Sequence, residues 1–323
     1  MPEFNVDTTV NEVVKALGTH ALGKTFVITG PSAGGIGATA AISLASANPT
    51  RLILAGRSQS KAQPVIGDIA KISNGAIVTT FVELDLTNLS SVREAAAKIR
   101  QAAPDGIDGL FNNAGIMAPR EYKKSVDGVE LQFAANHLGH FLLTNLLLPD
   151  IAKVNGIVSN ATSRAWTLVD PDYDDVNFQD GEKYHGWIAY SRSKTANITF
   201  SIALAKRVEE LGITVFAVDP GMALDSNLTK NSGIDNDWFG EGFRIATERA
   251  NGKAPEQPII NLQQAAATAV LTFLDPALKK STGSYLEECQ IRDGKLPEYV
   301  KSSENAEKLW EVSEQLVGEK FSP

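Results

Sequence analysis

Cysteine is almost absent from this sequence, since Cys289 is the single one among 323 residues. One cysteine excludes an internal disulfide and is typical of a reducing compartment. No apolar run approaches the roughly 20 residues that a membrane-spanning helix needs. Residues 1–9 are acidic and polar, unlike a secretory signal. We therefore expect a cytoplasmic protein without a membrane anchor.

An excess of positive charge is also missing, because 30 lysine and arginine residues stand against 38 aspartate and glutamate residues, for a formal net charge of −8. No basic cluster with interleaved aromatic residues occurs, so nucleic acid is not an expected partner. His137 and His140 lie one helical turn apart, but no third ligand follows at metal spacing. We expect them to pack inside a helix and predict no metal site.

What the chain does have is an alternation of strand-like and helical segments, with 43% hydrophobic residues. Strands are expected at residues 25–28, 51–55, 77–84, 107–112, 156–162, 213–218 and 283–289. Helices are expected at residues 7–18, from 36 to before 49, and at 89–102, 126–148, 190–211 and 261–274. This order predicts right-handed βαβ crossovers and an α/β fold, a single doubly wound parallel sheet of about seven strands (Rossmann fold) with helices on both faces.

The domain organisation expected from this pattern is one Rossmann-type domain over residues 1–323. Residues 1–23 form an N-terminal helical extension and residues 295–323 a C-terminal helical tail. Residues 222–258, from Met222 to Pro258, read as an irregular stretch after the sixth strand, and Trp238, Phe239 and Phe243 lie in it. Open α/β sheets bind ligands at the carboxyl ends of their strands, so we expect this stretch to act as a substrate lid. An ordinary packed loop is the alternative.

The segment Thr29-Gly-Pro-Ser-Ala-Gly-Gly-Ile-Gly37 joins the first strand to a helix. Glycines let the backbone approach a pyrophosphate, and the helix N-terminus presents free amides to it, so this segment predicts a dinucleotide site. Its candidate cofactor-binding residues are Gly30, Ser32, Gly35, Ile36 and Gly37. Arg57 lies 20 residues beyond Gly37, where an NAD-preferring fold has an acid. Arginine suits the 2′-phosphate, so NADP(H) is favoured over NAD(H); a solvated loop arginine is the alternative.

Tyr190 and Lys194 are four residues apart and lie one turn apart on one helix face. A free phenol has a pKa near 10, and a neighbouring ammonium lowers that pKa, which makes the phenol usable for proton transfer. A functionless surface pair is the alternative. The opposite face of the helix carries an apolar stripe that we expect to be buried, formed by Phe200, Leu204, Val208 and Leu211.

Taken in order, these motifs resemble the short-chain dehydrogenase/reductase family over residues 24–293. The matching residues are the glycine turn, Asp85-Leu86, Asn112-Asn-Ala-Gly115, Asn136, Ser163, Tyr190 with Lys194, and Pro220-Gly221. Within the family the chain is similar to the branch of retinol dehydrogenases and WW-domain oxidoreductases, in a form similar to fungal members. That likeness is carried by Asn136-His-Leu-Gly-His-Phe-Leu-Leu143, Asp174-Asp-Val-Asn-Phe178, residues 187–197 and Leu309-Trp-Glu-Val-Ser-Glu314.

The resemblance implies hydride transfer between a nicotinamide and a small-molecule carbonyl or alcohol. It assigns proton transfer to Tyr190 and a hydrogen bond to the developing oxyanion to Ser163. Lys194 would lower the Tyr190 pKa and hold the nicotinamide ribose, and Asn136 would anchor a water leading towards Lys194. The further cofactor-binding residues that it implies are Asp85, Leu86, Asn113, Ala114, Gly115, Pro220 and Gly221, together with Tyr190 and Lys194. Family members are often oligomers, so a homodimer and a monomer both stay open.

The sequence departs from the family pattern at several positions. The glycine turn has one residue more than usual, and no anchor of the membrane-bound kind precedes it. Thr162 stands where a second serine is usual and competes with Ser163 as the functional hydroxyl. Asp219 precedes Pro220, and Asp225 or Ser226 replaces the usual threonine near the nicotinamide amide. A dinucleotide-binding sensor or scaffold without turnover, and a lyase or epimerase on the same fold, are the competing functions.

Overall fold

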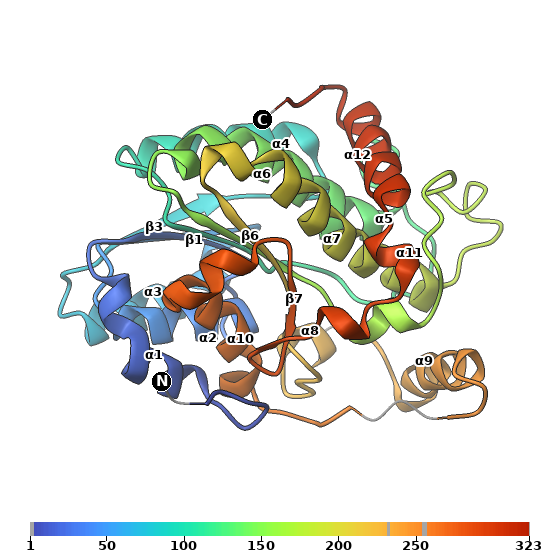
Figure 1. Ribbon diagram of the computed structural model, residues 1–323, viewed down its shortest axis with the longest axis horizontal. Helices are drawn as coiled ribbons and strands as arrows, with labels where there is room; N and C mark the ends of the chain where they lie inside the picture. Colours follow the sequence, from blue (N-terminus) through green and yellow to red (C-terminus); the bar gives the residue numbers. More distant parts are fainter. Residues whose placement is uncertain (1–2, 231–232, 254–256, 323) are drawn as a thin grey trace.

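The computed structural model describes residues 3–230, 233–253 and 257–322. Within these residues, one sheet of eight strands runs in the order β3-β2-β1-β4-β5-β6-β7-β8 (Figure 1). The strands are β1 Thr25–Thr29, β2 Arg51–Gly56, β3 Val78–Glu83, β4 Gly109–Asn112, β5 Ile157–Ala161, β6 Thr214–Asp219, β7 Tyr285–Glu287 and β8 Gln290–Ile291. All pairs from β3 to β7 are parallel, which confirms the predicted doubly wound sheet.

The eighth strand differs from the expectation of one continuous strand over residues 283–289. Glu288 and Cys289 both have positive φ, 55° and 61°, which is the backbone of a two-residue hairpin turn. β8 therefore returns antiparallel to β7. Neither residue type favours positive φ, so no turn signal marks this position in the sequence.

Helices cover both faces of the sheet (Figure 1). One face carries α1 Val10–Leu17, α2 Ile36–Ala45, α3 Gln59–Ile72 and α10 Leu262–Leu274. The other face carries α4 Leu89–Ala102, α6 Gly139–Ala152, α7 Gly186–Arg207 and α12 Ser303–Val317. The shorter helix α11 spans Glu298–Lys301. Helix α3 was not expected, and Pro64 inside it explains why its sequence reads poorly as a helix.

The segment expected as one helix over residues 126–148 is divided. It begins only at α5 Leu131–Phe133, where the Glu130 side chain accepts hydrogen bonds from the Gln132 and Phe133 amides. A π-helical turn, Ala134–Leu138, then joins α5 to α6. Such π-helical turns are rare and often lie at functional sites.

The stretch over residues 222–258 is more regular than expected, which corrects the sequence reading. It contains α8 Asn227–Lys230 and α9 Asn236–Arg249. Asp235 caps α9 by accepting a hydrogen bond from the Trp238 amide at 2.8 Å. Residues 231–232 and 254–256 of the expected lid lie outside the described residues.

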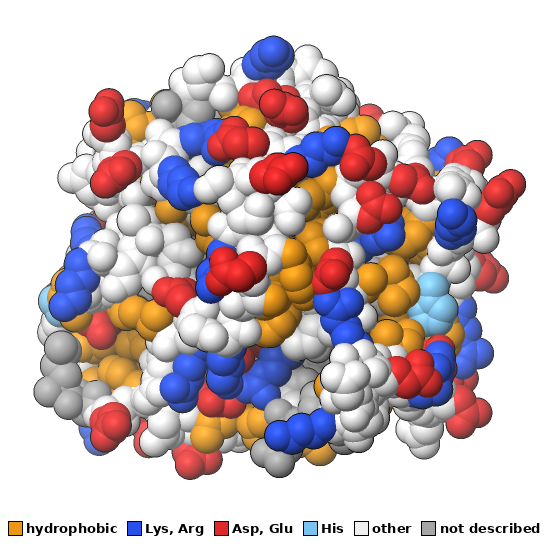
Figure 2. All heavy atoms as spheres, turned by 45° about the vertical axis from the view of Figure 1, so that its right-hand side comes forward, with side chains coloured by type: hydrophobic (Ala, Val, Ile, Leu, Met, Phe, Trp, Pro, Cys, Tyr) orange, Lys and Arg blue, Asp and Glu red, His pale blue; other side chains and the backbone are white. Residues whose placement is uncertain are grey.

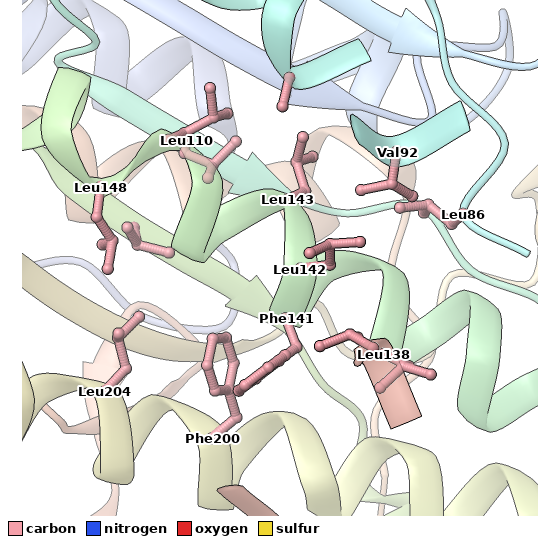
Figure 3. Packing of buried hydrophobic residues seen from close by; sticks show 14 of the residues in the cluster. Leu86, Val92, Leu110, Leu138, Phe141, Leu142, Leu143, Leu148, Phe200 and Leu204 are labelled. Atoms are coloured by element: carbon pink, nitrogen blue, oxygen red, sulfur yellow. The ribbon is translucent and has the colours of Figure 1, made fainter. Parts of the chain in front are cut away.

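The core between α6, α7 and the sheet is built from large aromatic and aliphatic side chains (Figure 3). Phe141 on α6 and Phe200 on α7 point toward one another, with ring centroids 5.4 Å apart. Trp310 on α12 lies 5.0 Å from the Phe141 ring and is 4% exposed. The C-terminal helix therefore completes this core.

The apolar stripe expected on the Tyr190 helix is buried in part. Phe200, Leu204 and Val208 are buried, but Leu211 is 36% exposed. Helix α7 ends at Arg207, and a short 3-10 turn with Gly212 in the left-handed region changes the direction of the chain. Leu211 therefore no longer follows the helical period.

The face of the molecule drawn in Figure 2 is mixed in charge. Figure 2 shows acidic and basic side chains interspersed over one face, with apolar side chains exposed between them. Across the described ranges, no helix is both long and apolar enough to span a bilayer.

Candidate active site

The predicted site residues follow the carboxyl ends of neighbouring strands, where parallel strands share one edge of the sheet. The residues are Gly30 after β1, Arg57 after β2, Asp85 after β3, Asn113 after β4, Ser163 after β5 and Pro220 after β6. The strand order changes direction between β1 and β4. Ligands of open α/β sheets bind at such a switch point.

The glycine turn fits tightly against the end of β4. Gly30 has φ +70°, and a Cβ there would lie 2.9 Å from the Ala114 Cα. A Cβ on Gly37 would lie 2.8 Å from the Gly30 carbonyl oxygen. The Asn113 side chain donates a 2.8 Å hydrogen bond to the Thr29 carbonyl oxygen and so ties the two loops together. Larger residues would not fit, and the backbone itself forms the surface of the turn.

The turn leads into an open helix N-terminus. Gly35 is the N-cap of α2, and among the described residues no side chain caps it. The first amides of α2 are therefore available to an anion. A glycine-rich turn and an uncapped helix N-terminus fit the pyrophosphate of a nicotinamide dinucleotide.

Gly34 belongs to this longer-than-usual turn and meets the start of α8. It has φ +75°, and its carbonyl oxygen accepts a 2.9 Å hydrogen bond from the Asn227 amide. The Asn227 side chain also donates to the Ala33 carbonyl oxygen. Sequence reasoning missed Asn227, because the bonded residues are 194 positions apart and no motif marks either of them.

Arg57 and Asp85 border the other side of the predicted dinucleotide site. Arg57 is exposed and, with Glu83 and Lys98, lines an open depression beside β3. The Lys61 carbonyl oxygen accepts a hydrogen bond from the Ala33 amide at 3.1 Å, so the start of α3 lies against the glycine turn. Asp85 is half-buried and holds the next turn of chain by accepting from the Thr87 amide at 2.9 Å and hydroxyl at 2.7 Å. Leu86 beside it is buried.

Helix α7 brings Tyr190 and Lys194 into the interior, where they are 5% and 4% exposed. The Lys194 Nζ lies 5.8 Å from the centre of the Tyr190 ring and donates a 3.2 Å hydrogen bond to the Ala161 carbonyl oxygen. The Ser163 side chain faces Tyr190 from the end of β5 and is a hydrogen-bond partner of its phenol. The structure thus brings Ser163, Tyr190 and Lys194 together.

Burial governs the proton affinity of both groups. It raises the pKa of the Tyr190 phenol above its ordinary value; the hydrogen bond from Ser163 opposes this rise and the charge of Asp219 adds to it. Burial also lowers the pKa of Lys194 to about 8, against the attraction of Asp219. The pKa of Tyr190 therefore shifts in the direction opposite to the lowering that a neighbouring ammonium predicts, and the main cause is loss of solvation.

Asn136 lies in the π-helical turn and fixes the loop that follows Gly115. Its side-chain oxygen accepts from the Ile116 amide at 2.8 Å, and its Nδ2 donates to the Ile116 carbonyl oxygen at 3.0 Å and to the Ser193 hydroxyl at 2.9 Å. Its own carbonyl oxygen is bonded to the His140 Nδ1 at 3.0 Å. Asn136 therefore joins the β4 loop to α7.

The two histidines are packed in the interior, as expected. Burial lowers the pKa of His137 to about 3 and that of His140 to about 4, so both are neutral near pH 7. The His140 Nε2 lies 2.9 Å from the Thr29 hydroxyl. Within the residues that the structure describes, no group of three potential metal ligands occurs.

Helix α9 covers the site on the side of Tyr190. The Trp187 indole donates to the Trp238 carbonyl oxygen at 2.6 Å, and the Trp238 indole donates to the Ala118 carbonyl oxygen at 2.7 Å. Gly242 permits this packing, because a Cβ there would lie 2.9 Å from the Trp187 ring. The resulting apolar cluster contains Met117, Ala118, Ala165, Leu168, Trp187, Tyr190, Ile234, Trp238, Phe239, Ile245 and Ala246.

The two candidates for the residue beyond Pro220-Gly221 have different surroundings. Asp225 is exposed, whereas Ser226 is buried and lies 3.2 Å from the Thr229 hydroxyl. Ser226 is therefore the one whose side chain is enclosed by the protein. Gly221 has φ +76°, and its amide is held by the Asp219 carboxylate at 2.7 Å.

Comparison with known proteins agrees with this geometry. The family model of short chain dehydrogenases matches residues 24–171. Human retinol dehydrogenase 13 is 35% identical over 300 residues, covering 92% of this chain and 85% of that protein. The chain belongs to the short chain dehydrogenase family. The WW domain-containing oxidoreductase of Drosophila melanogaster is 33% identical over 323 residues, covering 98% of this chain and 73% of the relative.

Solved structures of short chain dehydrogenases and related proteins share this architecture. A protein of Mycobacterium paratuberculosis superposes with a TM-score of 0.63 at 30% identity, covering 92% of this chain and 94% of that one. The NADPH-bound carbonyl reductase from chicken fatty liver gives a TM-score of 0.59 at 20% identity, covering 83% and 98%. At 20% identity, the likeness to the carbonyl reductase shows a shared fold and nothing further. The predicted family and the predicted likeness to retinol dehydrogenases are confirmed, and the chain is an NAD(P)-dependent dehydrogenase of this family.

Proposed function

We propose that this short chain dehydrogenase interconverts a small-molecule carbonyl compound and its primary or secondary alcohol, with NADP(H) favoured over NAD(H). The observation that carries the proposal is the convergence of Ser163, Tyr190 and Lys194 beside a glycine cradle. These groups are useful together for one chemistry, proton transfer to an oxygen as a hydride reaches its carbon.

The proposed division of work follows from where each group lies. A bound nicotinamide dinucleotide supplies or accepts the hydride. Tyr190 donates a proton to the substrate oxygen in reduction and removes it in oxidation. The Ser163 hydroxyl stabilises negative charge on that oxygen. Lys194 holds the nicotinamide ribose, and its positive charge favours the phenolate form of Tyr190 when oxidation requires it.

The remaining cofactor contacts are proposed from the sheet edge. The amides of residues 35–37 and the Ser32 side chain would hold the pyrophosphate. Asp85, Leu86 and the loop of Asn113, Ala114 and Gly115 would border the adenosine, with Pro220 and Gly221 beside the nicotinamide. Arg57 would bind the 2′-phosphate with a bidentate guanidinium contact. Asn136 would anchor a water next to Lys194.

The apolar cluster under α9 supports residues 222–258 as the substrate lid of a single domain. Its indole and phenyl rings would surround an apolar part of the substrate, while the polar groups of Ser163 and Tyr190 orient its oxygen. We place the protein in the cytoplasm, as a monomer or homodimer, with a small molecule as its substrate.

Replacement of Tyr190 by phenylalanine tests the function. The variant keeps the ring and loses one hydroxyl, so NADPH binding should persist while turnover falls at least roughly 10²-fold. The assay follows 340 nm absorbance with NADPH and a panel of ketones and aldehydes, and NADPH affinity is measured separately by fluorescence. Tyr173→Phe is the matched control, since Tyr173 is equally buried and its hydroxyl contacts Thr199 at 3.3 Å.

The alternatives predict other outcomes. NADPH binding by the wild type without turnover of any compound would favour a sensor or scaffold. Conversion of a substrate without net change in NADPH would favour a lyase or epimerase. Near-normal turnover by Tyr190→Phe would remove Tyr190 from the mechanism.

A further inference from the structure

A chain of buried polar side chains joins two loops of the site behind the catalytic residues. The Tyr285 hydroxyl lies 3.1 Å from the Asp219 Oδ2 and 2.9 Å from the Glu287 Oε2. Tyr285 is fully buried, and Asp219 and Glu287 are each 2% exposed. All three lie at the adjoining ends of β6 and β7, which pair Asp219 with Glu287.

One end of this chain fixes the turn that faces the proposed nicotinamide site. The Asp219 Oδ1 accepts the Gly221 amide at 2.7 Å, and Gly221 has the positive φ that this turn requires. The carboxylate thus sets the conformation of Pro220-Gly221. The other carboxylate oxygen of Asp219, Oδ2, accepts the hydrogen bond from the Tyr285 hydroxyl.

The other end fixes the loop that carries Ser163. Arg164, the next residue, donates from Nε to the Glu287 Oε2 at 3.1 Å and from Nη2 to the Glu288 Oε1 at 2.7 Å. Lys295 also pairs with Glu287. Two cations therefore neutralise carboxylates that would otherwise be costly to bury.

We propose that Asp219, Tyr285, Glu287 and Arg164 are positioning residues that set the Ser163 hydroxyl relative to the Pro220-Gly221 turn. The inference rests on the proposed function, since these two loops would contact the substrate oxygen and the nicotinamide. Tyr285 is the centre of the chain, because its hydroxyl is the contact between the β6 carboxylate and the β7 carboxylate.

The geometry explains why such a link is needed. β7 is three residues long, and Ser163 and Pro220 follow different strands of the sheet. The backbone pairing of β5 with β6 extends to the hydrogen bond of the Thr162 amide to the Val218 carbonyl oxygen, and beyond that bond the side-chain link joins the two loops. A displacement of about 1 Å between reacting groups costs up to roughly 10²-fold in rate.

The link also fits the charges around the catalytic pair. Asp219 lies close enough for its charge to act on both Tyr190 and Lys194, and Arg164 lies close enough to act on Asp219. Through Asp219, the positioning chain therefore contributes to the electrostatic surroundings of the pair as well as to the placement of Ser163.

The test is a double-mutant cycle of Tyr285→Phe and Ser163→Ala. In the otherwise native chain, Tyr285→Phe should lower kcat roughly 10- to 100-fold, with NADPH affinity changed less than about threefold. In the Ser163→Ala background the same replacement should cost less than about threefold, because its effect acts through Ser163. A merely structural role would cost the same in both backgrounds, and that result would overturn the proposal.

A second measurement does not depend on turnover. Hydrogen exchange at the Gly221 and Ala165 amides should become faster in Tyr285→Phe and stay unchanged in Tyr173→Phe. If the wild type shows no turnover with any substrate, the proposed function fails. The exchange result still decides whether the linked side chains of Asp219, Tyr285, Glu287 and Arg164 hold both loops. Unchanged exchange at both amides would overturn the proposal. Should Tyr285→Phe not fold, Arg164→Lys keeps the charge, breaks the two-nitrogen contact and should give the same pattern.

Discussion

The Thr162 hydroxyl donates a 2.7 Å hydrogen bond to the carbonyl oxygen of Lys194. This bond ties the end of β5 to α7 and turns the Thr162 side chain away from the phenol of Tyr190. Thr162 is 2% exposed, whereas Ser163 is half-buried and faces the phenol. The geometry therefore separates two neighbouring hydroxyls that the sequence left as competitors.

Ser163→Ala and Thr162→Val should consequently have different effects. Ser163→Ala should lower kcat by about 10²-fold, as expected for loss of one donor to an oxyanion. Thr162→Val should lower the free energy of unfolding by about 0.5 to 1.5 kcal/mol, because one buried hydrogen bond to the Lys194 carbonyl oxygen is lost, and should change kcat little. Steady-state kinetics and urea unfolding of both variants measure this. A larger kcat loss for Thr162→Val than for Ser163→Ala would mean that the Thr162 hydroxyl, and not that of Ser163, contacts the oxyanion.

Arg57 is the residue on which cofactor choice should depend. Arg57→Ala should weaken NADP binding by about one to two powers of ten and leave NAD binding nearly unchanged, since charge-assisted hydrogen bonds contribute roughly 1.5 to 3 kcal/mol each. Arg57→Asp should go further, because the carboxylate repels the phosphate and can accept from the NAD ribose hydroxyl.

The measurement is kcat/KM with each cofactor, and Arg51→Asp at the opposite end of β2 is the control. Lys61→Ala combined with Arg57→Ala shows whether the neighbouring lysine compensates. A wild type that prefers NAD, or a preference ratio that Arg57→Asp does not move, would make Arg57 a solvated loop charge.

The lid should become more ordered when ligands bind. Trp238→Phe removes the indole donor to the Ala118 carbonyl oxygen and keeps an apolar ring, so closure should weaken by about 1 kcal/mol and substrate KM should rise about fivefold. Hydrogen exchange of residues 236–249, with and without cofactor and product, reports closure directly. Arg244→Gln is the control, because Arg244 pairs with Glu241 and Glu248 on α9 itself. Equal protection with and without ligands would show that the segment is not a lid.

Stability should fall as the pH is lowered from about 6.5 towards 4. The folded-state pKa values of His137 and His140, about 3 and about 4, lie below the unfolded value near 6.5, so unfolding takes up protons in this range. Each histidine contributes at most about 1.4 kcal/mol per pH unit. Burial raises the pKa of Glu130 to about 7, so its folded state binds a proton in the same range and offsets part of the loss.

Urea unfolding at pH 7, 6 and 5 gives the slope. His137→Phe, within an aromatic cluster of Phe133, Phe141 and Phe200, should reduce the slope by about one proton. His20→Gln, at an exposed position, is the control. A slope that His137→Phe leaves unchanged would mean that His137 is not neutral in the folded protein.

The order of the parallel strands and the residues at their carboxyl ends could be predicted, because buried strands and their loop motifs are local in sequence. Ser163, Tyr190 and Lys194 belong to such local motifs, and the fold brings them together at the sheet edge. Helix α9 was missed because its apolar residues pack against Trp187, a contact that exists only in the fold. The contact of Asn227 with the glycine turn and the bonds of Tyr285 likewise join segments far apart in the chain. Local patterns carry no signal for such pairs.

The packing of Trp310 against Phe141 has a consequence for folding during synthesis. Residues 303–317 leave the ribosome long after α6 and α7 have emerged, and until then Phe141 and Phe200 lack the helix that covers them. The nascent chain therefore exposes this aromatic surface from the completion of α7 at Arg207 until α12 has emerged, and such surfaces promote aggregation. We expect efficient production of this protein to depend on protection of that surface by a chaperone.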